Sequence, residues 1–341
     1  MKRLIITSML LTGLLCSCEK PQTGGPDEQC RIYLTANTAK TKAPFTGTAP
    51  SESKPLDAMV CVSTDEYSYP SDGRDGTTDD GTIGRHLQVQ FSSGTRQLIN
   101  GAYYSQFHKD RTVYFTAMHP YAGWSFADNS SAQYTFDGTD DVMFAPQVTG
   151  KYGNQNPPTL NFQHLLTWIK MEIKADSEAV ATAWGPLRSI TITSRNSISI
   201  DISREFNKND IVFGNDVNMP FYKTSSPEEI FPDVTSGYNM TVASREVAYV
   251  LCSPVIASRY DTGAIGEVIR IPEYHIRIVS ENRDVTIPVD LMDAEGSYAD
   301  GSTMGKQFTL SLTFKMGNTI AVSTSVTDWS TGGIGFSKIE E

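Results

Sequence analysis

Many short segments of the chain alternate apolar and polar residues with a period of two. In "RSITITSRNSISIDIS", residues 188–203, isoleucines fill every second position of two runs, and "SRN" is expected to form the turn between them. In "QFTLSLTFKMGNTIAVSTSV", residues 307–326, the same alternation surrounds a turn at Gly317 and Asn318. This pattern predicts antiparallel strands that bury one face of a sheet.

The rest of the chain fits the same architecture. Further strands are predicted at 32–38, 58–63, 87–91, 112–118, 161–173, 247–253, 268–278 and 284–289, and a short helix at 176–184. The stretches 65–84 and 144–158 are predicted loops, and the second ends in two prolines that favour extended chain. We therefore predict an all-β protein with two β-sandwich domains, residues 30–158 and 159–341.

The first 17 residues, "MKRLIITSMLLTGLLCS", have the basic start and apolar run of a signal peptide, and the run is too short to span a membrane. Before Cys18 stand a small residue and, three positions back, a leucine. This resembles the lipobox of bacterial lipoproteins, in which the cysteine takes a diacylglycerol and starts the mature chain. The alternative is an ordinary secretory leader. We predict that Cys18 is lipidated and anchors the protein in the membrane.

Residues 18–29 are rich in Pro, Gly and charged residues, which predicts a flexible tether. The formal net charge of the whole chain is −11, and loss of Lys2 and Arg3 with the leader lowers it by two. An acidic protein of this kind is not expected to bind nucleic acid.

The remaining polar chemistry gives no catalytic or metal site. Cys30, Cys61 and Cys252 are too few and too far apart for a disulfide framework, although one pair could bridge, and we expect the last two as buried free thiols. His164 is expected to be a core residue bonded to the backbone, since the five histidines lack metal-ligand spacing. "DTGA", at 261–264, occurs once and is explained by turn chemistry. We predict no enzyme activity, no cofactor and no metal.

Several segments resemble the fimbrillin family of Bacteroidia, surface lipoproteins that include type V pilus subunits. The segments are "DVMFAP" (141–146), "LNFQHLLTWIKMEI" (160–173) and the final "GKQFTLSLTFKMGNTIAVSTSVTDWSTGG" (305–333). The F-x-H-L step at 162–165 and the V-T-D-W step at 326–329 are the most specific. "IYLTANTAKTKAPF", at 32–45, matches in outline, with Thr-Lys-Ala where relatives often carry Thr-Arg-Ala.

The resemblance implies two sandwiches of transthyretin-like, Greek-key type in a fimbrium on the outer membrane. It also implies assembly with other fimbrial subunits by strand exchange: a protease specific for Arg or Lys removes the first strand, and a neighbour's strand fills the groove. Here the removable strand would carry Ile32 and Leu34, and the candidate cleavage sites are Lys40 and Lys42.

The candidate donor is the C-terminal tail with Ile334, Phe336 and Ile339. Because Lys replaces the expected Arg, the sequence leaves open whether the chain is cleaved here. An uncut chain would remain anchored through Cys18 as an anchor, a tip subunit or a stand-alone lipoprotein.

An alternative function rests on the aromatic residues. "AYY" (102–104) and "PYAGW" (120–124) could form a sugar-stacking platform of a glycan-binding outer-membrane lipoprotein that does not polymerise and whose ligand lies on a host or bacterial surface. A flat exposed aromatic row would favour this alternative. A first strand buried in a hydrophobic groove would favour assembly.

Overall fold

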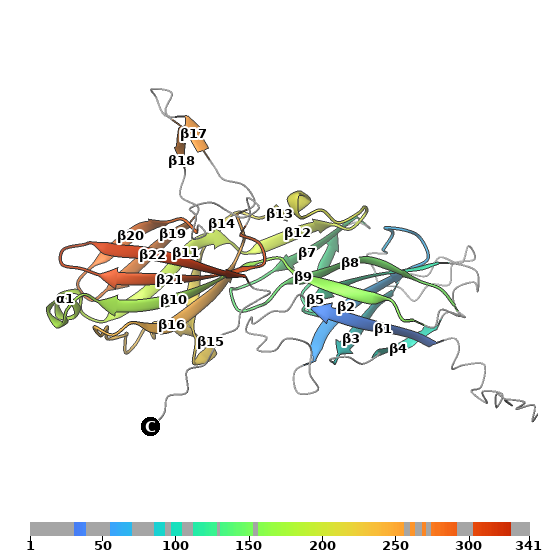
Figure 1. The fold of residues 1–341 in the computed structure, drawn as a ribbon, viewed down its shortest axis with the longest axis horizontal. Coiled ribbons are helices and arrows are strands. Elements are labelled where there is room, and N and C mark those ends of the chain that lie inside the picture. The colour runs from blue at the N-terminus through green and yellow to red at the C-terminus, as the bar shows by residue number, and fades with distance from the viewer. Residues whose placement is uncertain are drawn as a thin grey trace, which may run out of the picture.

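The computed structural model describes residues 31–38, 55–69, 85–92, 97–103, 112–127, 130–152, 156–255, 260–262, 268–270, 274–291 and 303–328. Strands dominate these residues, and they form two large sheets and two small ones (Figure 1). Within the described ranges, no helix has the length and apolar character needed to cross a membrane.

The first large sheet has the strand order β3-β2-β5-β8-β9-β1-β4. Its strands are β1 (Arg31–Thr38), β2 (Leu56–Ser63), β3 (Arg85–Phe91), β4 (Gln97–Tyr103), β5 (Val113–His119), β8 (Met143–Gly150) and β9 (Thr159–His164). Its central strands are buried on both faces: Val60 and Val62 of β2 lie in one hydrophobic cluster, and Cys61 between them lies in another. Cys61 is a buried free thiol, as expected.

The second large sheet has the order β20-β19-β11-β14-β16-β10-β21-β22, with β15 paired to β14. Its strands are β10 (Thr167–Ala175), β11 (Leu187–Arg195), β14 (Asp216–Lys223), β15 (Ser226–Phe231), β16 (Arg245–Cys252), β19 (Tyr274–Ser280), β20 (Asp284–Val289), β21 (Lys306–Phe314) and β22 (Ile320–Asp328). Strand β14 pairs with β11 up to Pro220 and with β15 and β16 beyond it, so the sheet folds at β14 into two layers.

Alternating side chains fill the space between these layers. Ile190 and Ile192 of β11 and Leu310 and Leu312 of β21 are all buried in one cluster. The predicted hairpin at 307–326 is present, with Phe314 opposite Ile320. The all-β fold class with two sandwich-like units is confirmed.

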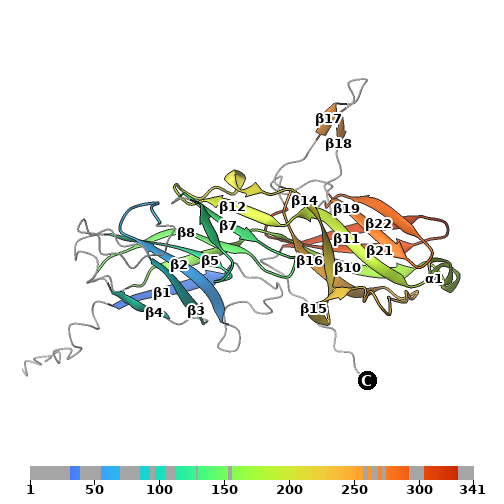
Figure 2. The same cartoon turned by 180° about the vertical axis from the view of Figure 1, so that it is seen from behind.

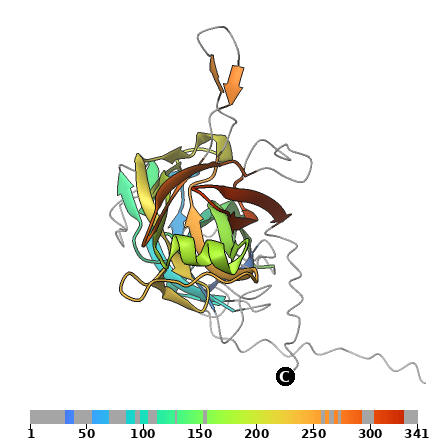
Figure 3. The ribbon, with the colours of Figure 1, turned by 90° about the vertical axis from the view of Figure 1, so that its left-hand side faces the viewer.

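Helix α1 (Glu178–Trp184) confirms the helix predicted from the sequence and lies at one end of the second sandwich (Figure 3). The hydroxyl of Ser177 caps it by accepting a hydrogen bond from the backbone N–H of Val180 at 3.3 Å. The indole of Trp184 is buried, donates to the carbonyl of Lys315 at 2.9 Å and meets the ring of Phe314 edge-on. The helix therefore closes the core at this end.

A small sheet joins the two halves of the chain. It has the order β13-β12-β7-β6, from β6 (Ser125–Ala127), β7 (Ser131–Thr135), β12 (Ser197–Asp201) and β13 (Val212–Phe213). Strand β12 follows β11 of the second sandwich but pairs with β7, which follows β5 of the first (Figure 2). The loop after β7 reaches the second sandwich, where the Gly138 carbonyl accepts a hydrogen bond from the N–H of Leu251 at 2.8 Å.

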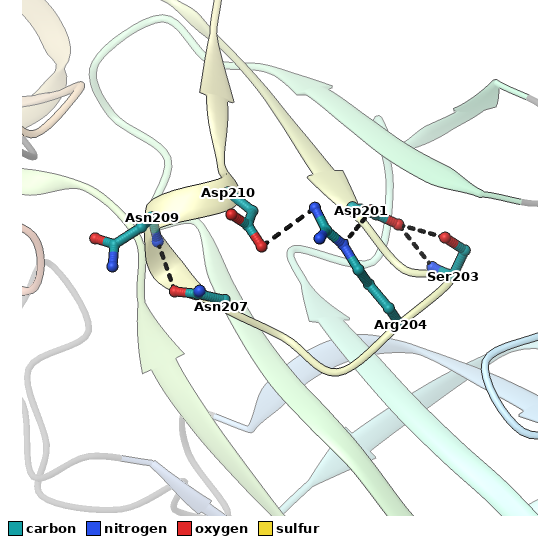
Figure 4. Close-up of polar contacts among 6 residues, drawn as sticks. All are labelled: Asp201, Ser203, Arg204, Asn207, Asn209 and Asp210. Atoms are coloured by element: carbon teal, nitrogen blue, oxygen red, sulfur yellow. Dashed lines mark hydrogen bonds and ion pairs between the residues drawn. The ribbon is translucent and has the colours of Figure 1, made fainter.

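The loop after β12 is held by a polar network (Figure 4). The carboxylate of Asp201 accepts hydrogen bonds from the Ser203 hydroxyl and from Nε of Arg204, both at 2.6 Å, and the Arg204 guanidinium also lies 3.2 Å from Asp210. The same loop carries Phe206, whose ring packs on Phe144 of β8 with centroids 4.7 Å apart. The network thus orders a loop that covers the first sheet.

Several sequence expectations are corrected. The run 161–173, expected as one strand, is two strands in different sheets, because the chain changes sheet at the buried pair Leu165 and Leu166. The expected loop 144–158 contains most of β8. Strands β11 and β12 form no hairpin, and 268–278 is divided between β18 (Val268–Arg270) and β19.

The domain limits 30–158 and 159–341 stay a prediction. Strand β9, which starts at Thr159, pairs with β8 and β1 of the first sheet. The chain enters the second sheet only at Thr167.

Candidate functional site at the first strand

Strand β1 lies inside the first sheet, between β4 and β9. Its first half pairs antiparallel with β4, where Leu34 faces Gln97, and its second half pairs parallel with β9, where Thr35 faces Thr159. The strand predicted at 32–38 is therefore present as an inner strand of the sheet. Strand β4, which covers the other side, was missed because Asn100 and Gly101 interrupt its pattern.

The core-facing side chains of β1 are completely enclosed. Ile32 and Leu34 are both 0% exposed, while Tyr33 between them is half-buried on the other face. The two aliphatic side chains belong to a cluster, called here the first-strand cluster. Its other members are Leu56, Ala58, Val60, Val62, Val89, Phe91, Val113, Phe115, Ala117, Met143, Ala145, Leu160 and Phe162. Loss of β1 would therefore open a hydrophobic groove within this cluster.

Polar contacts fix the register of β1 beside β9. The N–H of Thr35 donates to the Pro158 carbonyl at 3.0 Å, and the hydroxyls of Thr35 and Thr159 are 2.8 Å apart. The side-chain amide of Asn37 donates to Asn161 at 3.2 Å. Removal of β1 would leave the facing edges of β4 and β9 with unpaired backbone groups.

The other predicted site residues lie outside the described residues. These are Cys18, Lys40, Lys42, Ile334, Phe336 and Ile339, and Cys30 lies there as well. Along the sequence, Lys40 and Lys42 fall between the end of β1 at Thr38 and the start of β2 at Leu56. Cleavage at either lysine would cut β1 from the rest of the chain.

His164 is buried, as expected, but its partner differs from the expected backbone group. Its Nδ1 lies 2.7 Å from Oδ1 of Asp141, which is also buried. His119 is buried nearby, with Nδ1 2.7 Å from the carbonyl of Asp57, and burial lowers the pKa of His119. No group of three or more His, Cys, Asp or Glu side chains in the described ranges is arranged to hold a metal ion.

The aromatic platform considered at "PYAGW" is not formed. Trp124 is only 9% exposed, packs against Tyr134 with centroids 5.1 Å apart, and donates its indole N–H to the Pro120 carbonyl at 2.9 Å. This tryptophan is a core residue, so its face is not available to a sugar ring. Tyr104 of "AYY" lies outside the described residues.

Cys252 and Asp261, two further residues considered in the sequence analysis, lie within the described residues. Cys252 is a buried free thiol, as expected. Asp261, expected in a turn, lies in strand β17 (Tyr260–Thr262), which pairs with β18 in a two-stranded ribbon. This ribbon stands away from the second sandwich (Figures 1 and 3).

Together these features define an all-β protein whose first strand is inserted in a sheet formed by later strands. Residues 64–200 match the model of the family described as fimbrillin-like, which confirms the predicted resemblance. No curated protein matches this chain.

Three solved structures are similar to this chain at low identity. A proposed cell adhesion protein from Bacteroides uniformis has 14% identity and a TM-score of 0.48, with 88% of this chain and 98% of that chain covered. A fimbrial protein from Bacteroides vulgatus has 12% identity and a TM-score of 0.43, with 88% and 99% covered. A fimbrial assembly protein from Parabacteroides distasonis has 11% identity and a TM-score of 0.41, with 87% and 97% covered.

Proposed function

We propose that this protein is a fimbrial subunit, or a fimbria-associated lipoprotein, that acts in adhesion at the cell surface. In this proposal it assembles with other subunits by strand exchange after a protease removes β1. The observation that carries the proposal is the position of β1, whose Ile32 and Leu34 are fully buried between β4 and β9. The fimbrillin-like match of residues 64–200 supports the same class of function.

Strand exchange has a clear physical basis at this position. An unpaired buried backbone N–H or C=O costs free energy, so the vacated edges of β4 and β9 favour a replacement strand. The pockets left by Ile32 and Leu34 favour a donor with apolar residues at alternate positions. Ile334, Phe336 and Ile339 offer such residues in the C-terminal tail and are our candidate donor.

Membrane attachment is the second part of the proposal. A lipid on Cys18 would hold the exported chain on the outer membrane through the tether at 18–29, and cleavage at Lys40 or Lys42 would release the subunit from that anchor. A chain that is never cleaved would stay at the membrane as an anchor or tip subunit. We expect no catalytic activity.

Limited trypsin treatment of the leaderless, unlipidated protein tests the proposal. Cleavage near Lys40 or Lys42 should come first and should yield oligomers that resist SDS. A Lys40→Gln/Lys42→Gln double variant should remain monomeric under the same treatment, and truncation after Thr331 should abolish the ladder if the tail is the donor. Cleavage at the lysines without any oligomer would count against strand exchange.

The second candidate is a glycan-binding surface lipoprotein that does not polymerise. The "PYAGW" segment does not support it, because Trp124 is buried. A cavity in the second sandwich that is lined by Tyr238 and Arg245 does support it. The N-terminal sequence of the protein recovered from cells separates the two candidates: a start beyond Lys40 indicates processing, and a lipidated Cys18 indicates retention.

A further inference from the structure

A cavity of about 530 Å³ lies on the second sandwich, away from β1. It is bounded by the end of β14, the turn between β14 and β15, the end of β15, the loop after β15 and the start of β16. Its volume falls in the range of about 300–1,000 Å³ typical of small-molecule sites. Its lining includes two aromatic rings and several charged side chains, namely Phe231, Tyr238, Lys223, Asp233, Arg245 and Glu246.

The aromatic wall of the cavity is rigid. Phe231 is buried and meets Tyr238 edge-on, with centroids 5.0 Å apart. The backbone of Tyr238 exchanges two hydrogen bonds of 2.9 Å with Leu187, which ties the loop to β11. The half-buried Tyr238 ring therefore offers a fixed surface on which the apolar face of a sugar ring can stack.

Most charges around the cavity are already paired. Lys223 forms an ion pair with Glu229, and Glu246 accepts a hydrogen bond from Lys170 at 3.2 Å. Arg245 differs, because its exposed guanidinium has no hydrogen-bond or ion-pair partner among the described residues. Arg245 and Tyr238 both line the cavity. Burial raises the pKa of Tyr238, and the nearby charge of Arg245 acts against this rise.

Asp233 supplies a fixed acceptor. Its Oδ1 accepts backbone hydrogen bonds from Thr235 at 2.7 Å and Ser236 at 3.2 Å, and these bonds lower the pKa of its carboxyl group. The carboxylate is thus ionised at neutral pH and held in one orientation. Its other oxygen makes none of these bonds and can accept from a ligand hydroxyl.

We propose that this cavity binds an acidic sugar of the hexuronate or sialate class. The sugar carboxylate pairs with Arg245, a sugar hydroxyl donates to Asp233, and the ring stacks on Tyr238. The planar guanidinium fork suits a carboxylate better than a neutral hydroxyl, so a neutral sugar would leave Arg245 unused. An acidic peptide could also pair with Arg245, but the Tyr238 surface and the Asp233 acceptor together suit the apolar face and the hydroxyls of one sugar ring. The site needs no cleavage of β1 and is independent of strand exchange.

Ligand-observed NMR on the uncut, leaderless protein tests this proposal. The probes are glucuronate and N-acetylneuraminate, and glucose is the neutral control. We expect the acidic sugars to bind at least about tenfold more tightly than glucose and to weaken as salt is added. Arg245→Gln should weaken glucuronate binding by about tenfold or more, and Arg245→Lys should fall between, because lysine keeps the charge without the fork.

Arg204→Gln is the matched control, since Arg204 is an exposed arginine that is not part of the cavity lining. It should leave binding unchanged, and the circular dichroism of all variants should match the parent. Equal binding of glucose and glucuronate, absence of binding by both acids, or an unaffected Arg245→Gln variant would overturn the proposal. Tighter binding of an acidic peptide would assign the cavity to a different ligand class. None of these results depends on whether the trypsin-treated protein forms SDS-resistant oligomers.

Discussion

Leu34→Ala should strongly destabilise the first sandwich if β1 forms part of its packed core. Leu34 is completely buried within the first-strand cluster. Replacing a buried leucine by alanine removes its transfer free energy and leaves a cavity, which together cost about 2–5 kcal/mol. Domains are stable by only about 5–15 kcal/mol, so the single variant should fold and unfold at lower urea concentration.

Ile32→Ala should cost a similar amount, because Ile32 is equally buried. The double variant should then lose about 4–10 kcal/mol if the two effects add, which approaches the whole stability of a domain. We expect it to lose the folded first sandwich. Urea unfolding of the leaderless chain, followed by circular dichroism, measures both effects.

Tyr33→Thr is the matched control, since Tyr33 is a half-buried residue on the opposite face of the same strand. It should shift the urea midpoint much less than Leu34→Ala. A Leu34→Ala loss below about 1 kcal/mol would refute the reasoning, because it would mean that the site is not a packed core position. In the strand-exchange proposal, the weakened variant should also form ladders faster once it is cut.

Three further predictions concern other parts of the chain. Cys18→Ala should move the protein from the membrane fraction to the soluble fraction, and retention after a carbonate wash would contradict lipidation. Burial lowers the pKa of His119, so below about pH 6.5 the histidine is protonated in the unfolded chain before it is protonated in the folded protein. The free energy of unfolding should therefore fall as the pH drops below about 6.5. His119→Asn should reduce the decrease in urea midpoint between neutral and acid pH. Gly138→Ala should lower the free energy of unfolding by about 1–3 kcal/mol because of the positive φ of 112°, and by more because the new Cβ would lie 3.0 Å from Val250. Gly317→Ala, with φ 74° and open space around the new Cβ, should show the backbone cost alone. Calorimetry measures both effects.

Strict alternation made part of the fold predictable from sequence. The hairpin at 307–326 was found with its turn because β21 buries every second residue against one core. Strand β8 was missed because its burial does not alternate: Met143, Phe144 and Ala145 are all buried in a sheet that is covered on both faces.

The candidate sites were less predictable, because they depend on contacts between distant residues. The alternation of Ile32 and Leu34 indicated a strand, but nothing in the sequence places Thr35 beside Thr159 or β4 on the other side. The cavity at Tyr238 and Arg245 was missed altogether. Its residues come from 223–247, a stretch without a motif, and only the fold brings the ring and the guanidinium together.

The separation of the two hydrophobic clusters supports the strand-exchange proposal. The first-strand cluster lies on one face of the first sheet, and the larger cluster begins on its other face and continues through the second sandwich. Pairing of β7 with β12 and the bond from Leu251 to Gly138 join the two units on that second side. Ile32 and Leu34 belong only to the first-strand cluster. Removal of β1 would therefore open the groove without breaking the contacts that hold the sandwiches together, so an incoming strand would meet an intact two-unit subunit.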